Sequence, residues 1–257
     1  MQPLNTLVRV KHRLVLGMAL GVWGLASQAQ TTLGLGTGIM PKYEGSKHYT
    51  SRLYPVLSHQ NEIFFITPKA EMPAVGLQSK LTDDWKVGVF AGYQWGRKAS
   101  DAHRLTGTDR IKNYGNVGVF SQHQIGDLNL DVTLYHALKK DYGLGVQLAA
   151  SYPIWQGGLS GLRIGGNLAF MNTDAMQTHF GVKPHEAAAS QGQLHTHNAS
   201  GGLKSVTIYG LYTYRLSDNF SLNTALGLKN LTGDARNSPL TEQKTSVYGS
   251  VGVGYSF

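Results

Sequence analysis

The sequence predicts an all-β membrane protein, a transmembrane antiparallel up-and-down β-barrel, and three observations carry this prediction. Apolar residues alternate with polar or small residues over several stretches of about 9–11 residues, the length that a tilted strand needs to cross a bilayer. The connections between these stretches alternate between short polar turns and longer links. The composition is rich in glycine (32) and tyrosine (13) and contains no cysteine, which suits a barrel wall around a polar interior and excludes a disulfide scaffold.

Residues 1–29 have the features of a secretory signal peptide. The segment begins with three basic residues and no acidic residue, continues with an apolar stretch from Leu14 to Leu25, and ends in Ser27-Gln28-Ala29. The apolar stretch is short of the roughly 20 residues of a membrane-spanning helix, although a retained anchor is the alternative. We expect cleavage after residue 29 and one mature domain, 30–257, whose net charge falls from +8 to +5 without the leader.

Six stretches show the period-two alternation most clearly. They lie at 85–95, 128–138, 143–154, 162–170, 220–228 and 246–257. In each, one face is apolar and the other is polar or small, as in a strand with lipid on one side. Aromatic residues such as Trp85, Trp95 and Trp155 lie near their ends, where interfacial girdles are expected. The region 31–81 is less regular, because Pro55, Pro68 and Pro73 interrupt it.

The connections predict the topology. Short turns stand at 59–62, 82–84, 126–127, 156–161 and 217–219, and longer links at 41–48, 69–73, 97–113, 139–143, 173–203 and 232–244. In bacterial barrels the short turns are periplasmic and the long loops extracellular. We therefore expect about twelve strands, with ten and fourteen as alternatives, both termini in the periplasm, and a place in the outer membrane of a Gram-negative bacterium.

The last strand ends the chain on an aromatic residue. Tyr255 and Phe257 share its apolar face with the valines before them. We interpret these two residues as the C-terminal signal that the barrel-assembly machinery reads during biogenesis. Phe257 would then lie at the bilayer boundary, with its carboxylate in water.

The opposite faces of the strands supply a candidate lumen. Its residues of inward parity and polar or charged character are Lys86, Gln94, Asp131, Gln147, Arg163, Asn167, Asn223 and Lys229. A barrel of about twelve strands is often filled by side chains or loops. These residues would either form ion pairs that plug the interior or line a weakly selective path.

Four short motifs resemble those of the MipA/OmpV family of outer-membrane proteins. They are PKYEGS (Pro41, Tyr43, Gly45, Ser46), LTDDWKVGVFAGYQWGR, GDARNSP (Gly233, Asp234, Ala235, Ser238, Pro239) and the final GVGYSF. The resemblance covers the mature chain. It implies a scaffold that links a lytic transglycosylase to a bifunctional murein synthase, while other members are described as porin-like proteins or adhesins. It implies no catalytic residue and no cofactor.

Two long links invite functional interpretations besides the family motifs. The 97–113 link is basic, which suggests either a solvated loop beside an anionic leaflet or a site for lipopolysaccharide phosphates. The 173–203 link contains His179, His185, His195 and His197, but their spacing matches no standard metal site. We expect this segment to be a mobile, low-complexity loop without a metal.

An outer-membrane hydrolase is the remaining alternative. Ser121 and His123 share one strand face, but no acidic residue is placed to orient the histidine, and the pair lies towards the periplasmic end of its strand. We therefore predict a protein that is not an enzyme and binds no nucleic acid. Its expected environment is outer-membrane lipid and lipopolysaccharide, and its expected role is a scaffold, with a narrow porin-like channel or an adhesin as alternatives.

Overall fold

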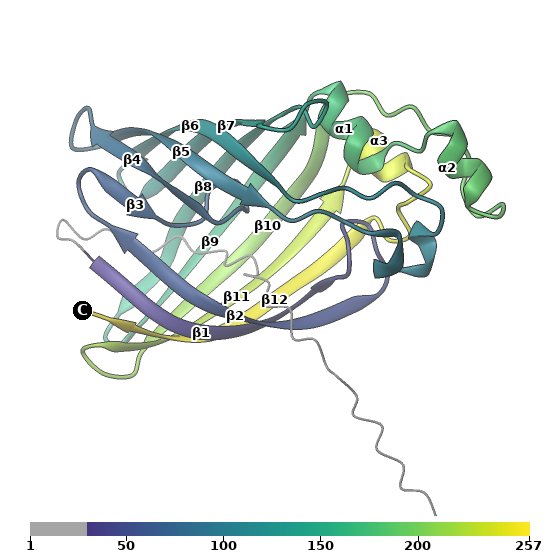
Figure 1. Cartoon of the computed structure of the whole chain (residues 1–257). Coiled ribbons are helices and arrows are strands. Elements are labelled where there is room, and N and C mark those ends of the chain that lie inside the picture. Colours follow the sequence, from purple (N-terminus) through teal and green to yellow (C-terminus); the bar gives the residue numbers. More distant parts are fainter. Residues whose placement is uncertain (1–29) are drawn as a thin grey trace, which may run out of the picture.

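A computed structural model describes residues 30–257, which form a closed barrel of twelve antiparallel strands (Figure 1). The strands are β1 (Gln30–Pro41), β2 (Tyr49–Gln60), β3 (Phe64–Ile66), β4 (Ala74–Lys80), β5 (Trp85–Gln94), β6 (Tyr114–Ile125), β7 (Leu128–Ala137), β8 (Leu144–Gly157), β9 (Ser160–Met171), β10 (Gly202–Arg215), β11 (Phe220–Leu231) and β12 (Thr245–Ser256). Each pairs with its neighbour in the chain, and β1 pairs with β12 to close the barrel. The predicted fold class and strand number are confirmed. The predicted signal peptide, 1–29, lies outside the described residues.

The two ends of the barrel differ, as the lengths of the links predict. The helices α1 (Thr173–Phe180), α2 (Pro184–Ala189) and α3 (Gly233–Asn237) gather with the long loops at one end, and the C-terminus lies at the other with the short turns (Figure 1). By the rule for bacterial barrels, the helical end is extracellular and the short turns are periplasmic. Within residues 30–257, no helix combines the length and the apolar character needed to cross a membrane.

The outer face of the wall is apolar. Leu35, Leu53 and Leu226 are each more than 60% exposed, and Val251 and Val253 of β12 are also exposed. Exposed apolar side chains in such numbers would be unfavourable in water and are expected where the surface meets lipid. Near the periplasmic edge, the rings of Phe220 and Tyr255 pack 4.9 Å apart, and those of Tyr255 and Phe257 5.3 Å apart.

On the inner face, glycines leave room for aromatic rings from neighbouring strands. A Cβ on Gly36 of β1 would come within 2.7 Å of the Tyr54 ring on β2, and a Cβ on Gly165 of β9 within 2.5 Å of the Tyr209 ring on β10. Gly88 lies in the same way under Phe120. The many glycines of the sequence therefore allow large rings to lie flat against the inner wall of a narrow barrel.

The irregular region around the prolines has a specific cause. β3 has three residues and meets β2 only through His59↔Ile66 and Gln60↔Phe65. Most of β2 therefore pairs with β1 alone. Pro55 lies in this singly paired part, where its missing N–H does not interrupt a ladder.

The extracellular links pack into a folded cap. Tyr43, Leu105, Val182, Leu194 and Leu240, from four different links, form one buried cluster. A second cluster contains Met176, Phe180 and Ala199 together with Leu231 and Ala235.

The expectation that 173–203 is a mobile, low-complexity loop was wrong. It contains α1 and α2, and the Asn172 side chain caps α1 by accepting from the Ala175 N–H. The few apolar side chains of the segment are enough to fix it, because they are buried against other links. The GDARNSP motif forms the short helix α3, and Gly233, its first residue, has a positive φ of 52°.

Candidate functional site: the interior of the barrel

Residues of the described chain, 30–257, line two chambers in the lumen. An outer chamber of about 1160 Å³ lies under the cap, and a second chamber of about 450 Å³ lies at the periplasmic end. Between them is a gap of about 30 Å³, which shares Ser250 with the periplasmic chamber and Glu71 and Lys229 with the outer one. The buried ring of Tyr54 lines all three spaces. The lumen is therefore constricted at the level of Tyr54 and the Glu71–Lys229 pair.

Four charged side chains from two links and two strands form a network at this constriction. Lys229 Nζ lies 2.6 Å from Glu71 Oε2 and 3.3 Å from Glu44 Oε1, and Lys204 Nζ lies 3.0 Å from Glu44 Oε1. Burial alone would raise the pKa of Glu44, but the ammonium groups of Lys204 and Lys229 outweigh it and hold that pKa well below its usual range. The network thus ties the first two extracellular links to the far wall of the barrel.

The link between β3 and β4 enters the lumen at the same level. Ala70 and Glu71 at its tip adopt positive φ values of 46° and 65°, an unfavourable conformation for residues other than glycine. Lys69 beside them lies 3.2 Å from Asp131 and 3.6 Å from the centre of the Phe120 ring. The strain is offset by the ion pairs that Lys69 and Glu71 make with opposite walls.

The rest of the cross-section is filled by apolar side chains. Phe65, Met72, Phe90 and Phe120 form a buried cluster inside the β3–β7 side of the barrel. The rings of Phe65 and Phe120 meet edge to face, 5.4 Å apart. Together with the ion network, this cluster narrows the lumen at mid-height.

Two of the family motifs, PKYEGS and GDARNSP, help to hold the links of the cap together. The Tyr43 hydroxyl donates to the Leu240 carbonyl at 2.9 Å and lies 3.1 Å from the Glu242 carboxylate. Burial and the nearby Glu242 raise the pKa of Tyr43, so the hydroxyl stays protonated. Asp234 accepts from the Ser200 N–H at 2.6 Å, which ties α3 to the preceding link.

His179 of α1 faces the outer chamber. Its Nε2 lies 3.0 Å from the Tyr114 hydroxyl, and the Arg97 guanidinium donates to the His179 carbonyl at 2.9 Å. Burial and the positive charge of Arg97 lower the pKa of His179 to about 4. The imidazole is therefore neutral at physiological pH and serves as a polar contact between α1 and the barrel.

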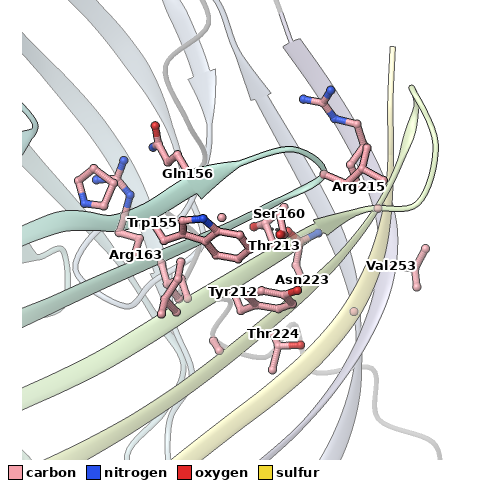
Figure 2. A pocket seen from close by; sticks show the side chains of 18 of the residues that line it. Trp155, Gln156, Ser160, Arg163, Tyr212, Thr213, Arg215, Asn223, Thr224 and Val253 are labelled. Atoms are coloured by element: carbon pink, nitrogen blue, oxygen red, sulfur yellow. Dashed lines mark hydrogen bonds between the residues drawn. The ribbon is translucent and has the colours of Figure 1, made fainter.

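The periplasmic chamber is lined by the ends of β8 to β12 (Figure 2). Arg163 donates to Ser151 Oγ at 3.2 Å, and Thr213 Oγ1 donates to Asn223 Oδ1 at 2.9 Å. Arg163 and Arg215 stand on opposite sides of this pocket in Figure 2, and neither forms an ion pair with a residue of the described chain. Gly158 and Leu159 of the short β8–β9 turn also line this chamber.

The predicted lumen residues lie on the inner face and divide between these features. Asp131 and Lys229 belong to the ion pairs, Gln94 lines the outer chamber, Arg163 and Asn223 line the periplasmic chamber, Gln147 and Asn167 are buried in the wall, and Lys86 is half-buried on β5. No ion pair joins two members of the predicted set among residues 30–257. Asp131 and Lys229 instead pair with residues of the extracellular links, and any role of the set in permeation stays a prediction.

Sequence reasoning missed Glu44, Glu71, Lys69 and Lys204. The first three lie in links, where the alternation of strands does not apply and cannot predict which way a side chain points. The alternation along β10 places Lys204 on the outer face. The β9–β10 pairing, however, shifts between Leu203 and Ser205, and this bulge brings both Lys204 and Ser205 to buried positions.

The other singled-out residues do not assemble a catalytic or metal site in the described part of the chain. His185 contacts Asp109 and His197 contacts the Asp234 carbonyl, so the histidines of the 173–203 segment point to different partners. No group of three or more metal-ligating side chains is found between residues 30 and 257. Ser121 accepts from the Trp85 indole at 2.8 Å and lies on the lipid-facing side of β6 with His123.

A family model described as MltA-interacting protein MipA matches residues 33–257. The chain belongs to the MipA family. The predicted family is thereby confirmed over essentially the whole barrel. No curated protein matches the chain.

Several solved structures are similar in shape. OmpT of Vibrio cholerae with loop L8 deleted is 9% identical, with 90% of this chain and 98% of that chain covered and a TM-score of 0.42. An outer-membrane channel of Pseudomonas putida F1 is 10% identical, with coverages of 91% and 97% and a TM-score of 0.45. OprB of Pseudomonas putida is 8% identical, with coverages of 90% and 94% and a TM-score of 0.45.

The family and the barrel together give the location. The wall is a closed barrel with an apolar outer face, and the chain belongs to the MipA family. The protein is therefore an outer-membrane barrel of a Gram-negative bacterium, as the sequence predicts.

Proposed function

We propose that this barrel is closed to solutes, has no catalytic activity and holds murein-processing enzymes at the inner face of the outer membrane. The constriction at Tyr54 and the Glu71–Lys229 pair carries this proposal, because a barrel blocked at mid-height acts through its two ends. The family description names an interaction with MltA, which supports a lytic transglycosylase as one partner. A bifunctional murein synthase is the second partner that the family resemblance implies.

The periplasmic turns supply the contact surface in this proposal. Asp83 and Asp84 lie in the β4–β5 turn, Asp127 in the β6–β7 turn and Asp218 in the β10–β11 turn, and all four are exposed. The turns are too short to wrap around a partner, so charge rather than area would guide the association. The matching face of an enzyme partner would be basic.

The test uses the mature protein immobilised in detergent and a purified lytic transglycosylase, with binding measured at low and at physiological salt. Retention by the wild type, and loss of about tenfold in affinity in Asp83→Asn/Asp84→Asn/Asp218→Asn, would support the proposal. Asp174→Asn on α1 is the matched control, because it removes an exposed acid at the extracellular end. Equal binding by the triple variant, or no retention by the wild type, would contradict the proposal.

A narrow anion channel is the second candidate, favoured by the charge of the lumen. The outer and periplasmic chambers lie in line, and the inward-facing Arg52, Arg163 and Arg215 are not neutralised by an acid in the described chain. This candidate requires the Glu71–Lys229 constriction to open. Conductance separates it from the scaffold, which needs no opening.

A further inference from the structure

One strand of the barrel has a free edge. Residues 49–58 of β2 pair with β1 on one side, whereas β3 meets β2 only at His59 and Gln60. On its other side this part of β2 has no strand partner among residues 30–257, and Pro55 in it has no N–H to offer. A free backbone edge is unfavourable in hydrocarbon unless it meets water or a bound molecule.

The outer chamber lies directly behind this edge. Its lining includes 50–55 of β2 on one side and 93–98, at the end of β5, on the other. Outside the same gap, Leu53 is 68% and Tyr93 is 42% exposed. Both lie in the extracellular half of their strands, so the gap between β2 and β5 opens at the level of the outer leaflet. We call this gap the lateral window.

The lateral window is lined by cations without an acidic partner in the described chain, although Arg97 also donates to the His179 carbonyl. Arg52, Arg97, Lys98 and Arg110 line the outer chamber, and none forms an ion pair within the described chain. The Nε atoms of Arg52 and Arg97 are buried without a hydrogen-bond acceptor. Of the acids that line the chamber, Glu44 and Glu71 bind the lysines of the constriction, and the Asp101 carboxylate accepts from the Lys98 backbone N–H. Arginine groups left in this way suit phosphate, which accepts from two N–H groups at once.

We propose that the lateral window admits one phosphate-bearing lipid of the outer leaflet, of the lipid A class. Its phosphates would bind Arg52 and Arg97 inside the chamber, and its acyl chains would leave through the window along the free edge of β2. A strand from a second copy would satisfy that edge but not the buried arginines, so the charge favours the lipid. This site goes beyond the proposed scaffold role and does not depend on it.

The test is native mass spectrometry of the mature protein, released from detergent after incubation with diphosphoryl lipid A. Two other arms use lipid A with both phosphates removed, and diphosphoryl lipid A in the presence of inorganic phosphate at about 10 mM as a competitor. The variant is Arg52→Gln, and Arg97→Gln provides a second variant should the first fail to fold. Arg163→Gln is the matched control, since it removes an inward-facing arginine from the periplasmic chamber. Heat-modifiable gel mobility shows that each variant is folded.

We expect wild type and Arg163→Gln to retain one lipid A, and Arg52→Gln to bind it about tenfold more weakly. The dephosphorylated lipid should not be retained, and free phosphate should not displace the intact lipid. Equal retention by Arg52→Gln and wild type, or retention of the dephosphorylated lipid, would overturn the proposal. Competition by free phosphate would reassign the arginines to a soluble anion, and a dimer in place of a lipid adduct would assign the edge to a second copy. None of these results bears on capture of the transglycosylase, so the two proposals fail separately.

Discussion

Lys229 holds the constriction together, and its removal gives the sharpest test of the packing of the lumen. Its ammonium group contacts Glu71 at 2.6 Å and Glu44 at 3.3 Å, and only 5% of its side chain is exposed. In Lys229→Met, Glu44 keeps Lys204, but Glu71 loses the one ion pair described for it. Breaking a buried ion pair costs about 3–5 kcal/mol, because an unpaired charge stays behind. The Glu71 side chain is 13% exposed, which lowers the cost of leaving its charge unpaired, so we expect a loss at or just below the lower end of that range, about 2–3 kcal/mol.

The free energy of unfolding is measured by urea titration of the mature barrel in lipid vesicles, followed by tryptophan fluorescence. The double variant Lys229→Met/Glu71→Gln should recover about 1–2 kcal/mol of the loss, because the unpaired carboxylate is gone. Lys47→Met is the control, since its pair with Glu242 is 57% exposed on the lysine side and such pairs contribute about 0–1 kcal/mol. A loss in Lys229→Met no larger than that of Lys47→Met, or strictly additive effects in the double variant, would refute the reasoning.

Three further predictions concern the cap and the wall. Tyr43→Phe removes the hydroxyl that bonds the first link to the last, so we expect a loss of about 1 kcal/mol and faster cleavage of the cap in limited proteolysis, with unchanged strand content by circular dichroism. The folded pKa of His179, about 4, lies below its ordinary 6.5, so the folded cap binds fewer protons between these values. Neutral His179 therefore contributes at most about 3 kcal/mol to the stability of the cap, in full above pH 6.5, and this contribution is lost as the pH falls towards 4. Hydrogen exchange of α1 should show this pH dependence, and His179→Gln should abolish it. Gly36→Val places a side chain where the Tyr54 ring lies, so the fraction that refolds, read from gel mobility, should fall sharply and recover in Gly36→Val/Tyr54→Ala.

Period-two alternation was enough to predict the wall of the barrel. Because lipid lies on one side of each strand and a polar interior on the other, apolar and polar residues must alternate along it. The apolar character of Val251 and Val253 therefore predicts that they face the lipid. The alternation of turn lengths then indicated about twelve strands, with ten and fourteen as alternatives, and predicted the orientation. The short β3 could not be predicted, because three residues carry too little pattern, and the prolines indicated only that the region 31–81 is irregular.

The contents of the lumen were beyond such reasoning. Lys229 reaches Glu71 and Glu44 across 158 and 185 residues of sequence, and no local pattern joins residues so far apart. Lys204 faces inward because of a β-bulge, and the local sequence of β10 gives no sign of that bulge. The cap was misjudged for a related reason, since the apolar residues of 173–203 are sparse and find their partners on other links.

The central claim is that the lumen is closed, and conductance of the refolded mature protein in a planar bilayer tests it most directly. Gel mobility confirms folding before insertion. We predict that the wild type stays silent, and that Lys229→Met, in which the tip of the β3–β4 link is released, shows conductance steps. Uniform, reproducible steps from the wild-type barrel would contradict the claim and make the channel the better account of the protein.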